Sequence, residues 1–266
     1  MFPLQRLGAE VWAIHTVQFS NHTGYGHWTG DVFGPESVRA LVDGIEARGV
    51  LPRCDAVLSG YLGSPAIGEA VLDAVARVRS ANPRALYCCD PVMGDDDTGV
   101  YVRPGIPELL AGQILPSADI ITPNRFEAEQ LTGVECSDLD ETKAAVMRLT
   151  GMLHPDGPRI VLLTSLRTAE TPPDCLDMLV AEAGRFHLLR TPLLPLQING
   201  TGDAIAALFL FHRLLSGDAA EALSRAGSSL HGILRRTVER GARELALVEA
   251  QVELVSPGRV FTPFSL

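Results

Sequence analysis

The sequence lacks an apolar run long enough to cross a bilayer, whose hydrocarbon core requires about 20 such residues in succession. Its N-terminus has no basic segment followed by an apolar core, so we expect no secretory signal. The pattern GxxxxGKS or GxxxxGKT is also missing, which excludes a P-loop kinase. Neither insertion into a membrane nor this common phosphate-binding motif is therefore expected.

Basic charge is scarce as well. The 22 Lys and Arg residues face 32 Asp and Glu residues, which gives a formal net charge of -10. An acidic surface repels a phosphate backbone, so we expect no nucleic-acid partner. An anionic small molecule would have to meet a local pocket rich in basic or amide groups, because the overall field does not attract it.

Cysteine is present five times, an odd number, and no CxxC pair occurs. Cys88 and Cys89 are adjacent in a strand-like run, so their side chains should point to opposite faces. This usage is typical of reduced, buried thiols. We therefore expect a cytoplasmic protein.

What the sequence has is an alternation of apolar, β-rich runs with amphipathic helical stretches. The run Ile160–Leu163 is continuously apolar, which indicates a strand buried on both faces by helices. The alternation predicts an α/β fold with three α/β/α layers and a mostly parallel central sheet flanked by helices on both faces. The expected strands are Val11–Phe19, Ala56–Tyr61, Ala85–Asp90, Ala118–Thr122 and Arg159–Thr164. The expected helices are Pro35–Arg48, Pro65–Ala81, Ile106–Leu115, Phe126–Leu131 and Leu139–Leu153.

The C-terminal part has a different pattern. A hairpin is expected from Asp177–Ala183 and Arg185–Leu193, followed by helices over Asp203–Leu215, Ala219–Arg240 and Ala242–Leu254. No internal repeat, low-complexity tract or linker interrupts the chain, and 46% of its residues are hydrophobic. We therefore expect one domain spanning residues 1–266.

The segment Asn199–Asp203 precedes a strongly helical stretch. Its glycines allow successive amides to point into one concavity, and the following helix adds its N–H groups and dipole. Such a loop can hold phosphate oxygens, while Asp203 could accept the proton of an attacking hydroxyl. An ordinary helix start with a capping Asp explains the motif equally well.

Two further motifs follow expected strands, at the edge of a parallel sheet where ligands bind. Asp90 and Asp95 project from a turn and could orient a magnesium ion or a phosphate, although Asp96 and Asp97 fit a solvated acidic loop. Asn124 and Glu127 are three residues apart at a helix start. They could hold water around a magnesium ion, or they could form a capping box.

The segment Val17–Trp28 mixes aromatic, hydroxyl and imidazole side chains with glycines. This composition suits a flat polar heteroaromatic ligand, and the segment Ser59–Gly63, which contains Tyr61, could supply a second aromatic wall. The alternative is a surface loop with two satisfied histidines, an interpretation that fits His27 better than Thr23.

Taken together, these segments closely resemble the pyridoxal kinases of the ribokinase-like superfamily. The order and spacing of the motifs match over almost the whole chain. The segments that carry the resemblance are Phe2–Gln5, Val17–Tyr25, Cys89–Asp95, Asp119–Glu129, Gly200–Asp203 and Ser228–Leu234.

The resemblance implies a phosphotransferase that moves the γ-phosphate of ATP to the 5′-hydroxymethyl of pyridoxal, and possibly of pyridoxine or pyridoxamine, in vitamin B6 salvage. Asp203 would be the catalytic base beside an anion hole of Gly200, Thr201 and Gly202. The substrate would be bound by Thr23, Phe19, Tyr61 and Asp203. ATP would be bound by Asp90, Asp95, Asn124, Glu127, Thr164, Ser165 and Thr201. Asp95 and Glu127 would serve Mg²⁺, and Thr122 and Thr164 a monovalent cation, K⁺ or Na⁺. A homodimer is also implied.

The sequence departs from the family at its N-terminus. Members start with a strand and a serine-containing turn, whereas Met1 stands here directly before Phe2. We therefore expect a chain that is N-terminally truncated relative to the family, without its first strand. Two alternatives to a pyridoxal kinase stay open. One is a hydroxymethylpyrimidine-type kinase of the same fold, and the other, because of the missing N-terminus, is a catalytically impaired protein that binds a B6 vitamer.

Overall fold

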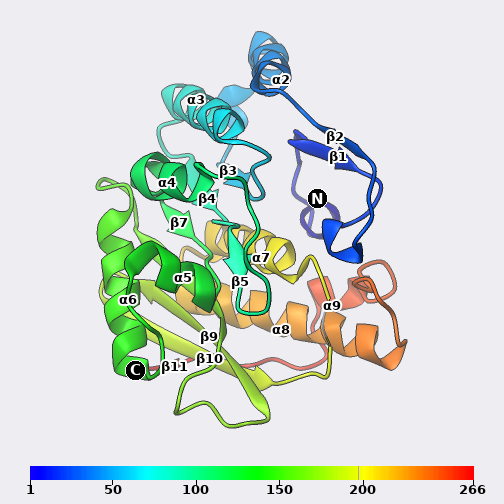
Figure 1. The fold of residues 1–266 in the computed structure, drawn as a ribbon, viewed down its shortest axis with the longest axis vertical. Coiled ribbons are helices and arrows are strands. Elements are labelled where there is room, and N and C mark those ends of the chain that lie inside the picture. Colours follow the sequence, from blue (N-terminus) through cyan, green and yellow to red (C-terminus); the bar gives the residue numbers. More distant parts are fainter. Residues whose placement is uncertain (197) are drawn as a thin grey trace. The chain divides into compact units, whose positions relative to one another are not determined.

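The computed structural model describes residues 1–196 and 198–266, which form two compact units (Figure 1). The first unit consists of residues 1–12, 122–150 and 160–266. The second unit consists of residues 13–121 and 151–159. In the described part of the chain, every helix is too short or too polar to cross a bilayer.

The strands of the first unit are paired in the order β11-β10-β9-β8, and each pairing is antiparallel. Their bounds are β8 Ile160–Leu166, β9 Cys175–Glu182, β10 Arg185–Pro192 and β11 Phe264–Ser265. The expected hairpin is confirmed as β9 and β10. Its two turn residues, Ala183 and Gly184, have φ of 51° and 74°, the backbone that matches the twist of a tight hairpin.

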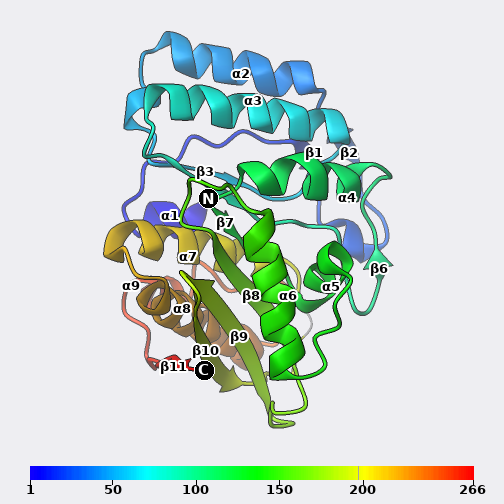
Figure 2. The same ribbon diagram turned by 90° about the vertical axis from the view of Figure 1, so that its left-hand side faces the viewer.

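Helices cover both faces of these strands. Their bounds are α1 Phe2–Arg6, α5 Arg125–Thr132, α6 Leu139–Met152, α7 Thr201–Ser216, α8 Ala219–Glu239 and α9 Gln251–Val255. Helix α8 packs against α7 and α9 and lies on β9 and β10, while α5 packs on β8. Figure 2 shows α6 beside β8 and β9, on the face away from α8. The first unit thus places α7 and α8 together as one layer.

The start of α8 follows from its sequence. Asp218 caps the helix by accepting a hydrogen bond from the amide of Glu221 at 2.8 Å, which satisfies one of the unpaired N–H groups of a helix N-terminus. Buried Leu223, Leu230 and Ile233 recur along the helix at turn-like spacing. This apolar stripe faces the strands, as the amphipathic pattern predicted.

The prediction of a helix over Ala242–Leu254 was wrong. Helix α8 ends at Glu239, and Gly241 has φ of 58°, a left-handed backbone that ends helices readily. The amide of Ala242 then donates to Thr237 O at 3.1 Å. The chain continues in turns, and only α9, Gln251–Val255, is helical. The predicted break between two helices at Gly241 is confirmed, but helical periodicity did not show that turns follow it.

The second unit contains the parallel strands, in the order β7-β4-β3. The bounds are β3 Ala56–Ser59, β4 Leu86–Cys89 and β7 Ile120–Ile121, with helices α2 Pro35–Ala47, α3 Pro65–Ala81 and α4 Ile106–Leu109. Helix α3 packs on β3, α2 and α4. The helix expected over Ile106–Leu115 is divided, because α4 is followed by a π-helical turn, Leu110–Ile114, and a 3-10 turn, Leu115–Ser117.

The first expected strand, Val11–Phe19, is much shorter in the structure. Only β1, Val17–Phe19, is a strand, and it pairs antiparallel with β2, Gly30–Val32. A Cβ on Gly30 would overlap Gln18 O at 1.9 Å, so this pairing depends on glycine. A second short ribbon joins β5, Gly94–Asp95, to β6, Gly99–Val100. Strands β3, β4 and β7 pair in parallel, whereas β8 to β11 and the two short ribbons are antiparallel, so the strands are mixed rather than mostly parallel.

Candidate active site

The entrance of α7 is built around a glycine. Gly200 is the N-cap of the helix and has φ of 85° and ψ of 4°, a left-handed conformation that costs other residues energy. The first N–H groups of a helix have no partner inside it, and the helix dipole makes them attractive to anions. Asp203 lies in this first turn and is exposed. A carboxylate and an anion-binding backbone therefore occur within a single turn.

A cavity of about 270 Å³ opens beside this entrance, inside the first unit. It is lined by Met1, Pro3, Asn199, Gly200, Asp203, Ala204, Ala207, Glu244, Leu245 and Leu247. Since a water molecule takes about 30 Å³ of the liquid, the space exceeds that of several waters. Asp203 can therefore meet a small ligand at the wall of this cavity.

Asn124 and Glu127 form the capping box that was one of the two predicted interpretations. Asn124 Oδ1 accepts from the amide of Glu127 at 2.8 Å, and Glu127 Oε2 accepts from the amide of Asn124 at 3.0 Å. The side chain of Glu127 is 3% exposed. The capping box therefore holds the Glu127 side chain in place at the start of α5.

The end of β8 is irregular. The register against β9 shifts between Leu163 and Leu166, and Ser165 has φ of 53°. Such bulges re-aim side chains and are frequent beside active sites. Ser165 is exposed, whereas Thr164 is buried and forms an isolated parallel bridge with Asn124. The Oγ1 of Thr164 donates a hydrogen bond to Pro123 O at 3.3 Å. The structure thus brings Thr164 and Ser165 next to the start of α5. Thr122, three residues before that helix, is buried.

In the second unit, the carboxylates of Asp90 and Asp95 differ in environment. Asp90 is 5% exposed and directly follows β4, and its amide donates to Ser59 O at 2.8 Å. Asp95 Oδ1 accepts from the amides of Asp97 and Thr98 and from Thr98 Oγ1 at 3.0, 2.7 and 2.8 Å. Asp95 therefore holds the turn between β5 and β6 in shape with one oxygen.

The aromatic segment also lies in the second unit. Phe19 contacts Trp28 with ring centroids 4.1 Å apart, and Thr23 is exposed at the start of a 3-10 turn, Thr23–Tyr25. Thr16 Oγ1 donates to Tyr61 O at 3.0 Å. This bond ties the segment before β1 to the loop after β3, so Phe19 and Tyr61 belong to connected segments of one unit.

The known proteins that this chain resembles are kinases. Residues 37–247 match the phosphomethylpyrimidine kinase family. The pyridoxal kinase PdxY of Granulibacter bethesdensis is 62% identical over 261 residues, with 98% of this chain and 91% of that protein covered. The pyridoxal kinase PdxY of Deinococcus radiodurans is 56% identical, with 98% and 88% covered. The chain belongs to the pyridoxal kinase family.

Solved pyridoxal kinases have the same fold. The enzyme from Leishmania donovani in complex with ADP and pyridoxamine superposes with a TM-score of 0.91 at 30% identity, covering 100% of this chain and 92% of that one. The predicted ribokinase-like α/β fold is thereby confirmed.

In this pyridoxal kinase, sequence reasoning missed part of the wall of the cavity beside Asp203. Glu244, Leu245 and Leu247 line the cavity, yet they lie in the segment predicted to be a regular helix. A Cβ on Gly200 would approach Leu245 Cδ1 to 3.6 Å. The sequence prediction already placed a break at Gly241, where a glycine often ends a long helix; no local signal showed that turns rather than a second helix follow it.

Proposed function

We propose that this chain transfers the γ-phosphate of ATP to the 5′-hydroxymethyl group of pyridoxal, giving pyridoxal 5′-phosphate in vitamin B6 salvage. The observation that carries the proposal is Asp203, a carboxylate in the first turn of a glycine-opened helix at the wall of a cavity. The high identity to pyridoxal kinases PdxY supports it. ADP occurs in the related structures, which supports a nucleotide as the phosphate donor.

Asp203 would act as the general base. Its carboxylate accepts the proton of the substrate hydroxyl as that oxygen attacks the terminal phosphate. The backbone amides of Gly200, Thr201 and Gly202 would stabilise the charge on the transferring group, because preorganised N–H donors cost no reorganisation during the reaction. Phosphoryl transfer needs little covalent help, so positioning and charge stabilisation account for the rate.

The nucleotide side would be formed by residues at strand ends and loop turns. These are Asp90, Asp95, Asn124, Glu127, Thr164, Ser165 and Thr201. The exposed hydroxyl of Ser165 at a strained bulge supports its contact with ATP.

Metal ions would assist binding of the phosphates. Mg²⁺ keeps several waters and often takes only one or two protein carboxylates. The buried Glu127 at the start of α5 fits such a site, and Asp95 is the second proposed carboxylate. The side-chain hydroxyls of Thr122 and Thr164 are buried; oxygen ligands of this kind suit K⁺ or Na⁺. When bound, the cations neutralise charge on the phosphates.

The pyridine ring would be held by Thr23, Phe19 and Tyr61. Thr23 would hydrogen-bond ring substituents, and the aromatic side chains would pack on the ring. Trp28 extends the aromatic surface of Phe19. These roles favour a B6 vitamer over a smaller heteroaromatic.

Three broader statements remain part of the proposal. The two units would act as one kinase domain over residues 1–266, since full-length relatives carry a single kinase name. The five cysteines are free thiols, which supports a cytoplasmic location. The resemblance to ribokinase-like enzymes supports a homodimer, which light scattering would show as twice 28.5 kDa.

A second function is favoured by one observation. The family matched by residues 37–247 is described as phosphomethylpyrimidine kinase, so a hydroxymethylpyrimidine is the competing substrate. Phe19 and Thr23, however, lie outside the matched residues. Two of the three proposed ring contacts therefore lie outside what this chain shares with that family, and only Tyr61 lies within it.

The test is ADP release with each candidate acceptor, and the phosphorylated product is identified by ³¹P NMR. We expect kcat/KM for pyridoxal to exceed that for hydroxymethylpyrimidine, with pyridoxine and pyridoxamine as further acceptors. The reverse preference would contradict the proposal. Pyridoxal binding without ATP-dependent product would instead establish an impaired vitamer-binding protein.

A further inference from the structure

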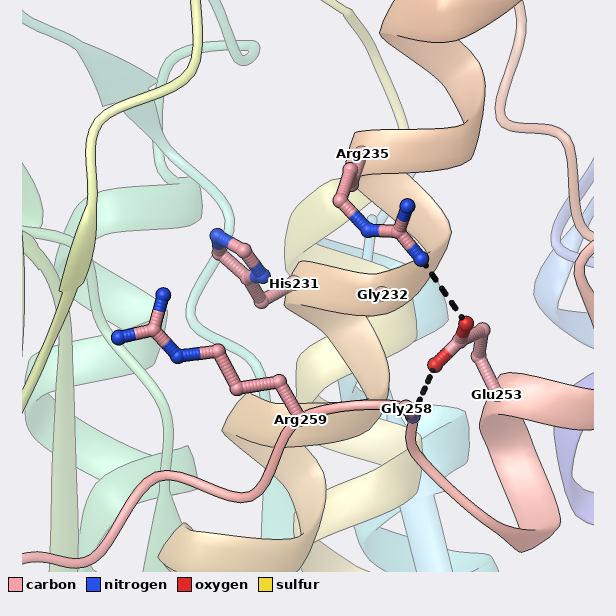
Figure 3. Close-up of a pocket in the computed structure, with 6 residues that line it drawn as sticks. All are labelled: His231, Gly232, Arg235, Glu253, Gly258 and Arg259. Carbon is pink, nitrogen blue, oxygen red and sulfur yellow. Dashed lines mark hydrogen bonds and ion pairs between the residues drawn. The ribbon is translucent and has the colours of Figure 1, made fainter.

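A second cavity, of about 250 Å³, lies in the first unit where α8 meets α9 and the C-terminal segment (Figure 3). It is lined by His231, Gly232, Arg235, Glu253, Gly258 and Arg259. None of these residues lines the cavity beside Asp203. Because a water takes about 30 Å³ of the liquid, the space is large enough for a small polyatomic ion.

His231 lines this cavity and carries a buried nitrogen that is unpaired in the described part of the chain. The residue is 8% exposed, and its Nε2 has no hydrogen-bond partner among the described residues. One edge-on contact holds the ring, since the centroid of Phe261 lies 4.8 Å away. Buried side-chain nitrogens are nearly always paired, and an unpaired one costs free energy. Because this nitrogen is enclosed, a ligand in the cavity would pair it only once the imidazole ring turns toward the cavity.

The charges around the imidazole are predominantly positive. Arg235 Nη2 lies 3.4 Å from Glu253 Oε1, and the amide of Gly258 donates to Glu253 Oε2 at 2.7 Å (Figure 3). Glu253 is thus already paired through both oxygens. Arg259 has no carboxylate partner among the described residues, and its guanidinium carbon lies 4.6 Å from the Phe261 centroid.

The arrangement has the donors of an anion site. Two arginines and one glutamate leave a local surplus of one positive charge, in a chain whose net charge is -10. Figure 3 shows the imidazole between the Arg235 and Arg259 side chains. Guanidinium groups donate strongly to phosphate and carboxylate oxygens. A contact with Phe261 orients Arg259 without using its N–H groups.

The titration of His231 agrees with this environment. Burial chiefly lowers its pKa, Arg259 and Arg235 lower it further, and Glu253 opposes them. A neutral imidazole still offers one N–H donor. A bound anion would offset the arginine charges and raise the pKa.

We propose that this cavity binds a small oxyanion of the phosphate or carboxylate type through Arg259 and Arg235, with the imidazole of His231 at its wall. The site is separate from the proposed kinase site, and it requires neither ATP nor pyridoxal. It would give this acidic protein an anion-binding surface on α8, a helix that packs directly against α7.

The experiment is an NMR titration of inorganic phosphate into the full chain without nucleotide or vitamer. The signals followed are the His231 ring and the amides of Gly232 and Gly258. We expect saturable shifts, with Arg259→Gln weakening binding at least about tenfold, which corresponds to ~1.4 kcal/mol. Arg236→Gln is the matched control, because Arg236 lies on α8 outside the cavity. Its affinity should equal that of the unaltered protein.

A second variant keeps the test independent of surface charge. His231→Phe retains a ring against Phe261 and removes the nitrogens, so it should also weaken phosphate binding. Titration with acetate distinguishes a carboxylate ligand from a phosphate ligand. Saturable binding of acetate would identify the ligand as a carboxylate, and saturable binding of phosphate alone would identify it as a phosphate group.

Several results would overturn the proposal. These are shifts that do not saturate, an equal loss in Arg236→Gln, or shifts confined to the Gly200–Asp203 amides. ADP release measured on the same samples keeps the two proposals apart. The Arg259→Gln variant should phosphorylate pyridoxal normally, whereas failure of the unaltered protein to release ADP would count only against the kinase.

Discussion

Asp203 is the residue on which the proposed chemistry depends most directly. Its position in the first turn of α7 is exposed to the cavity, and the fold does not bury it. Asp203→Asn keeps the shape and removes the base, so kcat should fall by about 10²- to 10⁴-fold while the unfolding temperature stays the same. Asp218→Asn, a helix cap outside the cavity, is the control and should leave kcat unchanged. A fully active Asp203→Asn enzyme would eliminate the base assignment.

His212 is a buried imidazole on α7, 5% exposed, with neither ring nitrogen hydrogen-bonded among the described residues. Burial, with a smaller contribution from Arg225, lowers its pKa from 6.5 to about 4. The unfolded chain therefore takes up a proton at a higher pH than the folded protein. The contribution of neutral His212 to the free energy of unfolding is complete above about pH 7 and is lost as the pH falls towards 4.

The expected loss of unfolding free energy from this residue is about 1–2 kcal/mol between pH 7 and pH 5. Urea unfolding at pH 7, 6 and 5 measures it. His212→Leu should make the pH dependence shallower, whereas His27→Gln, at an exposed position, should not. Equal slopes for the unaltered protein and His212→Leu would show that the buried imidazole is not responsible. His231, whose pKa is also lowered, contributes in the same direction.

At the scale of elements, Thr237 connects the end of α8 to the cavity wall. It is fully buried, and its Oγ1 donates to Ile233 O at 2.9 Å and accepts from the amide of Ala246 at 3.0 Å. The second bond fixes the turns that carry Leu245. Thr237→Val keeps the volume but leaves a buried N–H unpaired, which should cost about 1–3 kcal/mol of unfolding free energy.

The loosened wall should also raise KM more than it lowers kcat, because Thr237 positions the cavity without touching it. Thr150→Val is the matched control, since the only side-chain hydrogen bond of Thr150 within the described residues is the helix bond to Val146 O at 2.8 Å. Urea unfolding and steady-state kinetics of both variants decide the point. A KM unchanged in Thr237→Val would mean that the bond stabilises the fold alone.

The β9–β10 hairpin contains a buried ion pair. Asp177 is fully buried and accepts from Arg190 Nε and Nη2, both at 2.7 Å, and from Thr171 Oγ1 at 2.7 Å. The carboxylate raises the pKa of Arg190 through a direct hydrogen bond. Arg190→Gln should destabilise the protein by about 3–5 kcal/mol, because it leaves a buried charge unpaired.

The exposed pair Arg225–Glu221 provides the comparison for this hairpin. Its side chains are 57% and 47% exposed, so Arg225→Gln should cost less than about 1 kcal/mol. The double variant Asp177→Asn with Arg190→Gln should recover part of the loss. Equal destabilisation by the two single Arg variants in urea unfolding would refute the distinction.

At the scale of the whole molecule, the net charge of -10 affects every encounter with ATP. At 10 mM salt the screening length is about 30 Å, and at 150 mM it is about 8 Å. Screening should weaken the repulsion, so kcat/KM for MgATP should rise by a factor of about 2 to 10 across this range. Steady-state kinetics at increasing NaCl concentration measure this change in kcat/KM for MgATP. The control is kcat/KM for uncharged pyridoxine at saturating ATP. A fall with salt would show that a local basic surface dominates.

Much of the fold was readable from the sequence because local patterns agreed with the global structure. The alternation of strands and helices in the second unit, the β9–β10 hairpin, and the positions of α7 and α8 all follow from apolar periodicity, turn residues and caps. The glycine-opened helix start at Gly200 was recognisable in the same way, since glycine supplies the positive φ that this turn uses. The motif order also identified the family.

Tertiary structure decided the rest. Whether Asn124 and Glu127 cap a helix depends on geometry that spacing leaves open, and the structure shows the box. The strain at Ser165 comes from a register shift between two strands, which no local pattern encodes. The cavity wall from Glu244 to Leu247 depends on a hydrogen bond to Thr237, nine residues before Ala246. A sequence determines periodicities and turn chemistry, because these are local; it does not reveal which distant groups meet, because the packing of the whole chain selects those contacts.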